Sequence, residues 1–173
     1  MTVDQQDESH WCWAAVAISI RKFLNPGVST LPSGAPLSQG NIATEVLVRD
    51  RQVGVGVDCE HTPGFCNRAA RLGTALDVTG NFDSAYANSY FPFDSVREFV
   101  DAELPLAVRV AWWGGGAHYL VIDGYRVLTN GGQQVHVADP RYGESLWFYD
   151  GFRTDYRGAG LWQDTISVRK AEI

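Results

Sequence analysis

Residues 6–24 read QDESHWCWAAVAISIRKFL, a polar segment that changes at Trp11 into an apolar run with helical spacing. The next three residues, Asn-Pro-Gly at 25–27, end this helix. Cys12 therefore lies in the first turn of a long apolar helix. The positive end of the helix dipole and the unsatisfied backbone N–H groups of that turn favour a thiolate, which is the reactive form of cysteine.

Three more helices are expected in the first part of the chain. Ser38 is a suitable N-cap for a helix over 39–51, and a second helix is expected from about Asn67 to Leu76. Asp94 is expected to cap a third helix with the sequence SVREFVDAEL, which Pro105 ends. Helices are thus the regular elements expected before residue 105.

The second part of the chain has the character of an antiparallel sheet. Its segments are short, rich in Val, Ile and aromatic residues, and separated by turns that contain glycine. They are LAVRVAWW (106–113), HYLVIDGYRV (118–127), QQVHVADP (133–140), SLWFYD (145–150) and WQDTISVRK (162–170). Helices followed by strands predict an α+β fold. We expect one domain over 1–173, with a helical part at about 1–104 and a sheet part at about 105–173.

Composition excludes several classes of protein. Of the 173 residues, 45% are hydrophobic, which is enough for a core. The 14 Lys and Arg against 20 Asp and Glu, without a basic cluster, argue against nucleic-acid binding. No apolar run approaches the roughly 20 residues that span a bilayer. The polar, acidic segment 1–9 does not have the character of a signal peptide.

The cysteine count is odd, and this makes Cys12 a candidate for chemistry. Cys59 and Cys66 bracket the short loop CEHTPGFC, which leaves Cys12 unpaired. A disulfide fits this loop better than a zinc site that includes His61, because the spacing is unsuitable and no fourth ligand is evident. A disulfide implies that the chain matures in an oxidising compartment or tolerates one after secretion, and reduced cysteines in a cytosolic protein are the alternative. Cys12 is either a small buried apolar residue or a reactive thiol.

A reactive cysteine needs a base that a third group orients. His118 follows a glycine run and opens a strand, and Asp139 ends the strand expected to pair with it. This carboxylate would hold one ring nitrogen while the other faces Cys12. Asp123 competes for the role of the acid, but it lies five residues beyond His118 on the same strand and should point to the opposite face.

The remaining histidines are weaker candidates for the base. His136 lies in the middle of an expected strand and should face outward or pack against the sheet. His10 precedes Cys12 by two residues, so it is too close in the chain to act easily as its base, although it could line a cleft. His61 belongs to the cysteine loop.

Two motifs, in this order, resemble the papain-like cysteine peptidases. The first is Gln6, five intervening residues, and then Trp-Cys-Trp-Ala-Ala at 11–15. The second covers 118–143, with His-Tyr, apolar residues, Asp-Gly-Tyr and then Asp-Pro-x-Tyr-Gly. The chain lacks the usual Gly-Ser before the cysteine and has Asp139 where larger members have asparagine. It therefore resembles the small bacterial branch, including bacteriocin-processing double-glycine peptidases and secreted effector proteases.

The resemblance implies a papain-like fold with a cleft between a helical lobe and an antiparallel sheet. It implies that Cys12 is the nucleophile, His118 its base and Asp139 the orienting acid. Gln6, or its neighbour Gln5, would form the oxyanion hole with the backbone N–H of Cys12. The reaction would be hydrolysis of peptide bonds in a protein through a thioester, without metal or cofactor. A deamidase or transglutaminase-like acyl transferase with the same triad is one alternative, and a non-catalytic binding domain that kept the fold is another.

The resemblance also suggests a biological role and a binding groove. A bacterial toxin or effector, secreted or delivered into a target cell, would be accompanied by a dedicated inhibitor protein in its producer. Trp112, Trp113, Gly115 and Gly116 are expected to contribute to the substrate groove, although one of the two tryptophans could equally belong to the core.

Overall fold

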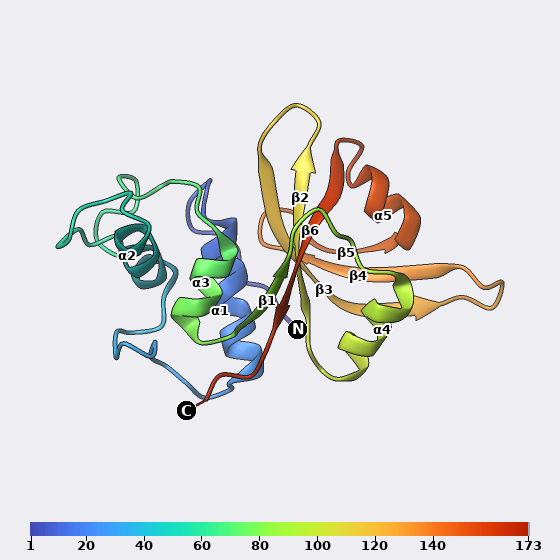
Figure 1. Ribbon diagram of the computed structural model, residues 1–173, viewed down its shortest axis with the longest axis horizontal. Helices are drawn as coiled ribbons and strands as arrows, with labels where there is room; N and C mark the ends of the chain where they lie inside the picture. Colours follow the sequence, from blue (N-terminus) through green and yellow to red (C-terminus); the bar gives the residue numbers. More distant parts are fainter. Residues whose placement is uncertain (173) are drawn as a thin grey trace.

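The structure, a computed structural model, describes residues 1–172 and has an α+β fold (Figure 1), which confirms the predicted class. The helices are α1 (Cys12–Leu24), α2 (Gln39–Arg49), α3 (Leu72–Thr79), α4 (Phe93–Asp101) and α5 (Tyr149–Asp155). The strands are β1 (Phe82–Tyr86), β2 (Leu106–Trp112), β3 (Ala117–Val127), β4 (Gln133–Asp139), β5 (Gly143–Phe148) and β6 (Gly160–Val168).

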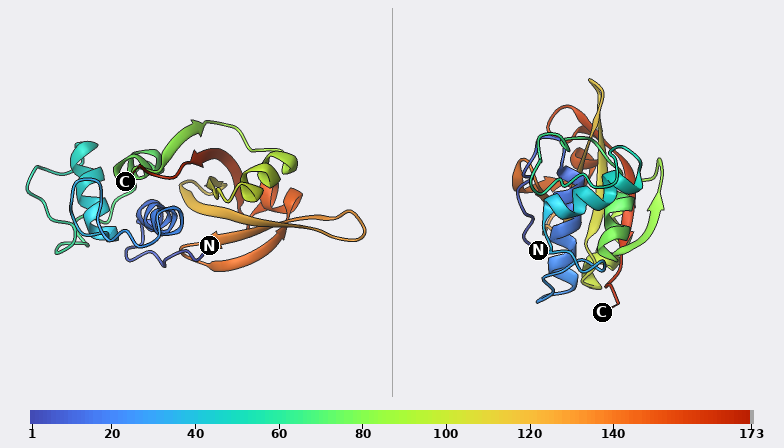
Figure 2. Two further views of the ribbon diagram at one scale, coloured as in Figure 1. Left: turned by 90° about the horizontal axis from the view of Figure 1, so that it is seen from below. Right: turned by 90° about the vertical axis from the view of Figure 1, so that its left-hand side faces the viewer.

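All strands belong to one antiparallel sheet with the order β1-β6-β2-β3-β4-β5. Two hydrophobic cores lie on either side of it. The first contains the apolar faces of α1, α2 and α3 together with sheet residues such as Val121 and Ile166. The second contains residues of α4 and α5 together with Leu120 and Val137. The helices accordingly flank the sheet on both sides in Figure 1. The β3–β4 hairpin extends beyond the rest of the molecule in Figure 2.

Helix α3 begins at Leu72, later than the start near Asn67 that the sequence predicts. The carbonyl of Arg68 accepts a hydrogen bond from Nε1 of Trp13, at 3.0 Å. A helix that included Arg68 would need the same carbonyl for its own backbone ladder. The segment before α3 therefore remains extended and lies against the beginning of α1.

Helix α4 begins at Phe93, so the prediction that Asp94 is its N-cap is wrong. Pro92 occupies the cap position, and no side chain caps the helix. Asp94 lies in the first turn instead, where its negative charge is still favourable beside the positive end of the helix dipole.

Two elements of the structure are not expected from the sequence. Strand β1, FDSAY, has two polar residues among five and is an edge strand that pairs only with β6, which explains its weak signal. Helix α5, YDGFRTD, contains Gly151 and only seven residues. Residues 82–101, which the sequence assigns to the helical part, contribute β1 to the sheet and α4 to its second core.

Candidate active site

Cys12 is the first residue of α1 and lines a cleft of about 1170 Å³ together with His118. The side chain of the preceding residue, Trp11, does not cap the helix. Among residues 1–172 no acceptor bonds the backbone N–H of Cys12. The sulfur therefore lies at a helix N-terminus whose N–H groups are free for a negatively charged group.

Trp11 and Trp13 fix the start of α1. Both indoles are 1% exposed. Nε1 of Trp11 donates to the carbonyl of Cys66 at 2.9 Å, and Nε1 of Trp13 donates to the carbonyl of Arg68 at 3.0 Å. Because these two bonds lie on either side of Cys12, they tie the first turn of α1 to the segment at the end of the cysteine loop.

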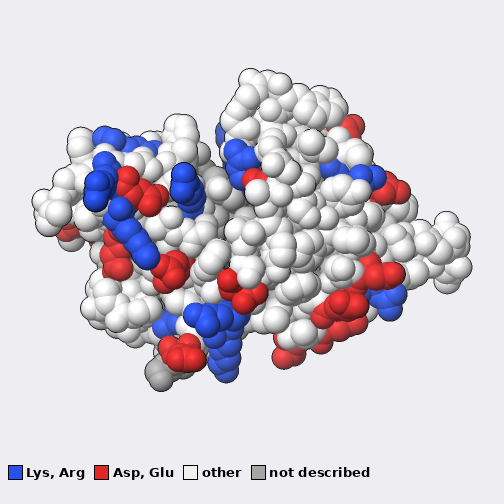
Figure 3. All heavy atoms as spheres, viewed as in Figure 1, with Lys and Arg blue, Asp and Glu red and all other residues white. Residues whose placement is uncertain are grey.

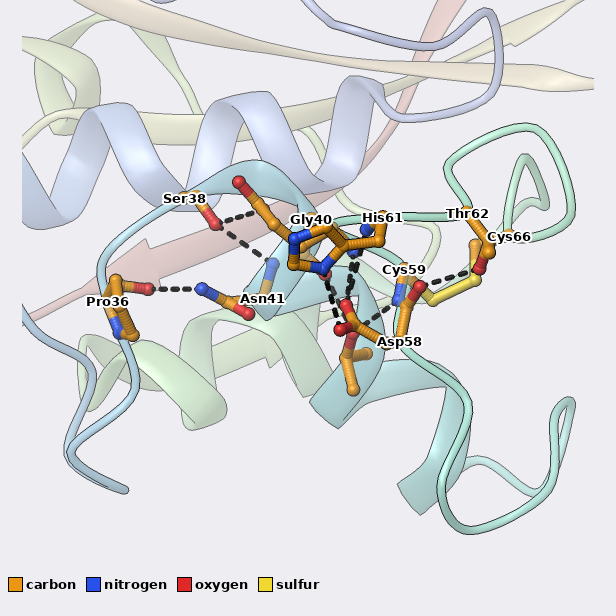
Figure 4. A network of polar contacts seen from close by, with 11 residues as sticks. Pro36, Ser38, Gly40, Asn41, Asp58, Cys59, His61, Thr62 and Cys66 are labelled. Carbon is orange, nitrogen blue, oxygen red and sulfur yellow. Dashed lines mark hydrogen bonds and ion pairs between the residues drawn. A yellow bond between two sulfur atoms is a disulfide. The ribbon is translucent and has the colours of Figure 1, made fainter.

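The cysteine loop contains a disulfide between Cys59 and Cys66. Asp58, the residue before the loop, is hydrogen-bonded to several loop residues. Its carboxylate pairs with Nδ1 of His61 at 2.8 Å, as Figure 4 shows. The loop is also fixed to α2, where Oγ1 of Thr44 accepts from the backbone N–H of Cys59 at 2.8 Å. Both sulfurs are bonded to each other, so the zinc alternative has no thiolate ligands here.

His118 and Asp139 are hydrogen-bonded across neighbouring strands, with 2.8 Å between Nε2 and Oδ1. The register of β3 and β4 pairs Val121 with Ala138, which places Asp139 opposite Leu120 and on the face that His118 shares. His118 is 5% and Asp139 3% exposed. This bond fixes Nε2, so Nδ1 of His118 is the ring nitrogen left for another partner.

The carboxylate of Asp139 is bound from four directions. Besides His118, Oδ1 accepts the backbone N–H groups of Arg141 at 2.7 Å and Tyr142 at 3.0 Å. Oδ2 accepts the hydroxyl of Tyr156 at 2.7 Å. Burial alone raises the pKa of Asp139, but the bonds from His118 and the other donors outweigh it and hold this pKa below its usual value.

The surroundings of His118 decide its protonation. Burial alone lowers the pKa of His118, but the hydrogen bond that its Nε2 donates to Asp139, the interaction with the Cys12 side chain and the charges of both groups outweigh it. Together they raise the pKa to about 9. The imidazole is therefore protonated at neutral pH and stands beside the sulfur as a cation.

Aromatic rings enclose the His118–Asp139 pair. Trp112 stacks on the imidazole at 6.1 Å between ring centroids, and Tyr142 approaches it edge-on at the same separation. Trp112 also stacks on Tyr156 at 6.2 Å. Tyr156, which is fully buried, was not identified from the sequence. Nothing in the segment around it marks the residue, because only the fold brings it to Asp139.

Gln6 has a different set of contacts from those expected of an oxyanion donor. Its Nε2 donates to the carbonyls of Glu8 and Ser9, both at 2.8 Å, and Oε1 is buried without a partner among residues 1–172. Gln6 is not among the residues that line the cleft. Its backbone N–H donates to Pro140 at 3.0 Å, which holds the segment before Cys12 against the end of β4. The neighbouring Gln5 has an exposed side chain.

The other candidates for the acid and for the base have partners other than Cys12, His118 and Asp139. Asp123 sits at an irregularity in the pairing of β3 with β4 and bonds the N-terminal amine of Met1 and, at 2.6 Å, Nδ1 of His136. His10 lines the cleft but is exposed and contacts Asn67.

Of the four residues expected in the substrate groove, two line the cleft and two do not. Trp112 and Gly116 line the cleft, whereas Trp113 and Gly115 do not. Trp113 is 65% exposed, and its backbone N–H donates to Ala159 at 2.9 Å. Trp112 has its main contacts with His118 and Tyr156, so it is as much a part of the wall around the imidazole as of the groove.

The residues that the structure describes contain no group of three or more His, Cys, Asp or Glu suited to holding a metal ion. No helix within residues 1–172 combines the length and the apolar character needed to cross a membrane.

Comparisons with known proteins place the chain in a family. Two solved structures of similar fold are bromelain from Ananas comosus in complex with the E64 inhibitor and a recombinant stem bromelain precursor. The first has 13% identity and a TM-score of 0.51 over 96% of this chain and 93% of that chain. The second has 16% identity and a TM-score of 0.51 over 97% of this chain and 66% of that chain.

A third structure, the Pseudomonas avirulence protein AvrPphB, has 10% identity and a TM-score of 0.42 over 98% of this chain and 96% of that chain. No curated protein sequence matches the chain. The family model described as papain-like cysteine protease AvrRpt2 matches residues 1–153. The chain therefore belongs to this family of papain-like cysteine proteases and is a cysteine peptidase.

Proposed function

We propose that the whole chain acts as one catalytic domain that hydrolyses peptide bonds with a triad of Cys12, His118 and Asp139. The observation that carries the proposal is that His118 interacts with both Asp139 and Cys12. One ring nitrogen is bonded to Asp139 at 2.8 Å, and the Cys12 side chain is a further group that raises the pKa of the imidazole. Nucleophile and base also line the same cleft.

The proposed reaction begins with attack of the Cys12 thiolate on the scissile carbonyl carbon. The protonated imidazole of His118 favours the thiolate before attack and then gives its proton to the leaving amine. The result is a thioester between Cys12 and the acyl part of the substrate. His118, now neutral, takes a proton from water, whose oxygen attacks the thioester and releases the acid. Asp139 holds the ring in place through both steps.

The proposed oxyanion hole combines the free backbone N–H of Cys12 with the side-chain amide of Gln6. The free N–H at the helix N-terminus supports the first donor. The second donor requires Nε2 of Gln6 to give up or share a bond to Glu8 or Ser9 when substrate enters. The unpartnered Oε1 supports such a rearrangement, because the present position leaves a buried acceptor unsatisfied.

We further propose that the substrate is a protein and that the chain acts as an effector or toxin delivered into another cell. Membership of a family described by AvrRpt2 supports an effector role. The Cys59–Cys66 disulfide fits passage through an oxidising environment. A producer of such a toxin would need a dedicated inhibitor protein. Toxicity of the wild type, and not of Cys12→Ala, in a target cell would test this role, with protection by a producer protein as the test of the inhibitor.

The test of the proposed reaction compares wild type with Cys12→Ala in a cell lysate by N-terminal proteomics. New protein termini that appear only with the wild type are expected. Intact targets that gain about one dalton, without new termini, would instead indicate a deamidase, and cross-linked targets a transglutaminase. Identical termini with both proteins would exclude a Cys12-dependent protease.

A further inference from the structure

The cleft extends away from Cys12 across three neighbouring strands. Tyr119 of β3 pairs with Arg109 of β2, and Arg109 pairs with Asp164 of β6. All three residues line the cleft. Because adjacent strands are about 4.8 Å apart, this row spans roughly 10 Å from the strand of His118. An extended peptide bound at Cys12 can therefore place a side chain over the row within about three residues of the scissile bond.

The guanidinium of Arg109 is only partly satisfied by the protein. Its Nη1 contacts Oε1 of Gln163 at 2.5 Å and Oδ2 of Asp164 at 3.3 Å. Nε and Nη2 have no acceptor among residues 1–172. A guanidinium carries five N–H donors, so most of its donors remain free in the cleft.

Asp164, in contrast, is already well bound. Oδ1 of Asp164 accepts the backbone N–H of Asn88 at 2.8 Å, and Oδ2 contacts Arg109. The side chains of Arg109 and Asp164 are 32% and 24% exposed, so both groups are shielded in part from water. The Arg109–Asp164 pair therefore offers the free N–H donors of Arg109, rather than free carboxylate acceptors, to a bound substrate side chain.

Other charges in the cleft add to this preference. The ionised residues of the cleft lining, His118 and Cys12 aside, are Arg71, Arg109 and Arg141 against Asp50 and Asp164. The guanidinium of Arg71 has no hydrogen bond or ion pair within residues 1–172, whereas its backbone carbonyl accepts from Ala75. The chain as a whole has a formal charge of −6. In Figure 3, Lys and Arg side chains lie on both rims of the hollow between the helical part and the sheet. The cleft is thus locally positive on an acidic protein.

We propose that the cleft selects substrates with an acidic side chain, Asp or Glu, within three residues of the scissile bond, and that Arg109 binds its carboxylate. The planar fork of the guanidinium suits a carboxylate, and Arg71 adds positive charge to the same cleft. The inference rests on the proposed protease function and defines its substrate class. It makes Arg109 a specificity residue that does not take part in bond cleavage.

The test uses quenched fluorescent peptides based on a cleavage site found by N-terminal proteomics. Each of the three positions on either side of the scissile bond carries Glu in one peptide and its isostere Gln in another. For the wild type, kcat/KM is expected to be about tenfold higher with Glu at one position, because a hydrogen bond to a charged group has this strength. Arg109→Gln should abolish the preference, and Arg71→Gln should reduce it without loss of cleavage.

Arg126→Gln is the matched control, since Arg126 lies in the β3–β4 hairpin, outside the cleft, and bonds Gln134. Labelling of Cys12 by an epoxide inhibitor shows that each variant is folded and competent. Equal cleavage of Glu and Gln peptides by the wild type at every position overturns the inference, as does an unchanged preference in Arg109→Gln. Equal failure of wild type and Cys12→Ala to cut any peptide would instead contradict the proposed function, and the inference with it.

Discussion

Tyr156 donates its hydroxyl to Oδ2 of Asp139 at 2.7 Å, and the other oxygen of the same carboxylate accepts from His118. The phenol thus lies one hydrogen bond behind the imidazole. Tyr156 is fully buried at the end of α5, and the pKa of its hydroxyl is raised above its usual range by burial, by the charge of Asp139 and by the bond to that carboxylate. The hydroxyl is therefore protonated at neutral pH and acts as a donor.

Tyr156→Phe removes this donor while it keeps the ring. We expect a loss of about 1.5–3 kcal/mol in the free energy of unfolding, since the bond is to a buried charge. The value of kcat/KM should fall about three- to tenfold, because the carboxylate that orients His118 is less firmly held. Urea unfolding and steady-state kinetics measure the two effects.

Tyr125→Phe is the control for this change. The hydroxyl of Tyr125 donates to Asp101 at an exposed site, at 2.9 Å. Its loss should change stability by less than about 0.5 kcal/mol and leave kcat/KM unaltered. An equal effect of both substitutions would show that Tyr156 has no particular connection to the site.

Asp139→Asn keeps the shape of the side chain and removes its charge. The carboxylate contributes both a hydrogen bond and a charge to the pKa of His118, which is about 9. We therefore expect this pKa to fall and kcat to fall by about tenfold or more, as measured by NMR titration of the ring and by kinetics. Asp123→Asn, which affects a carboxylate paired with His136 instead, should leave kcat unchanged. An unaltered His118 pKa in Asp139→Asn would contradict the assigned pairing.

The pKa of His118 also predicts the pH dependence of stability. Folding raises this pKa from 6.5 to about 9, so the folded state binds the proton more tightly than the unfolded chain does. The stabilisation is fully present below pH 6.5 and disappears as the pH rises through about 9. The difference in unfolding free energy between wild type and His118→Ala should therefore be smaller at pH 10 than at pH 6. A difference independent of pH would exclude a raised pKa.

The same protonation predicts an alkaline limit to activity. In the proposed reaction the leaving amine takes its proton from the imidazolium of His118, so kcat/KM should decline as the pH rises through about 9. A pH profile of peptide cleavage measures this limit. Activity that continues to rise to pH 10 would argue against His118 as the proton donor.

Removal of the disulfide by the double change Cys59→Ser and Cys66→Ser is expected to cost about 2–3 kcal/mol of stability, as for a short closed loop. It should also lower kcat/KM, because the carbonyls of Cys66 and Arg68 hold Trp11 and Trp13 on either side of Cys12, the proposed nucleophile. Thiol reductants should destabilise the wild type and have no further effect on the double variant. Full activity of that variant would show that the loop does not support the site.

The sequence predicts elements well where local signals are strong. The helix that begins with Cys12 ends at Leu24, where Asn-Pro-Gly follows, and the glycine-separated segments form β2 to β6. The sequence does not reveal strand β1 because its pairing partner, β6, lies far away in the chain. It does not reveal helix α5 because this helix has only seven residues and contains Gly151. The start of α3 was misplaced because an indole on α1 takes a carbonyl that a longer helix would need.

The residues of the candidate site also differ in whether the sequence alone reveals them. Cys12, His118 and Asp139 carry motif and position signals in the sequence, and all three can be named from it. Tyr156 and Arg109 cannot, because each is defined by a partner from another element: Asp139 for the phenol and Asp164 for the guanidinium. The amide of Gln6 matches the motif by spacing, but its contacts to Glu8 and Ser9 depend on a local turn that spacing does not determine.

The rate at which iodoacetamide alkylates Cys12 at pH 6 tests the pairing of sulfur and imidazolium most directly. Cys12 is the free cysteine of the chain, so intact-mass analysis reports on it alone. We predict that the wild type reacts at least about tenfold faster than His118→Ala, because the cation favours the thiolate. Equal rates in the two proteins would contradict the account.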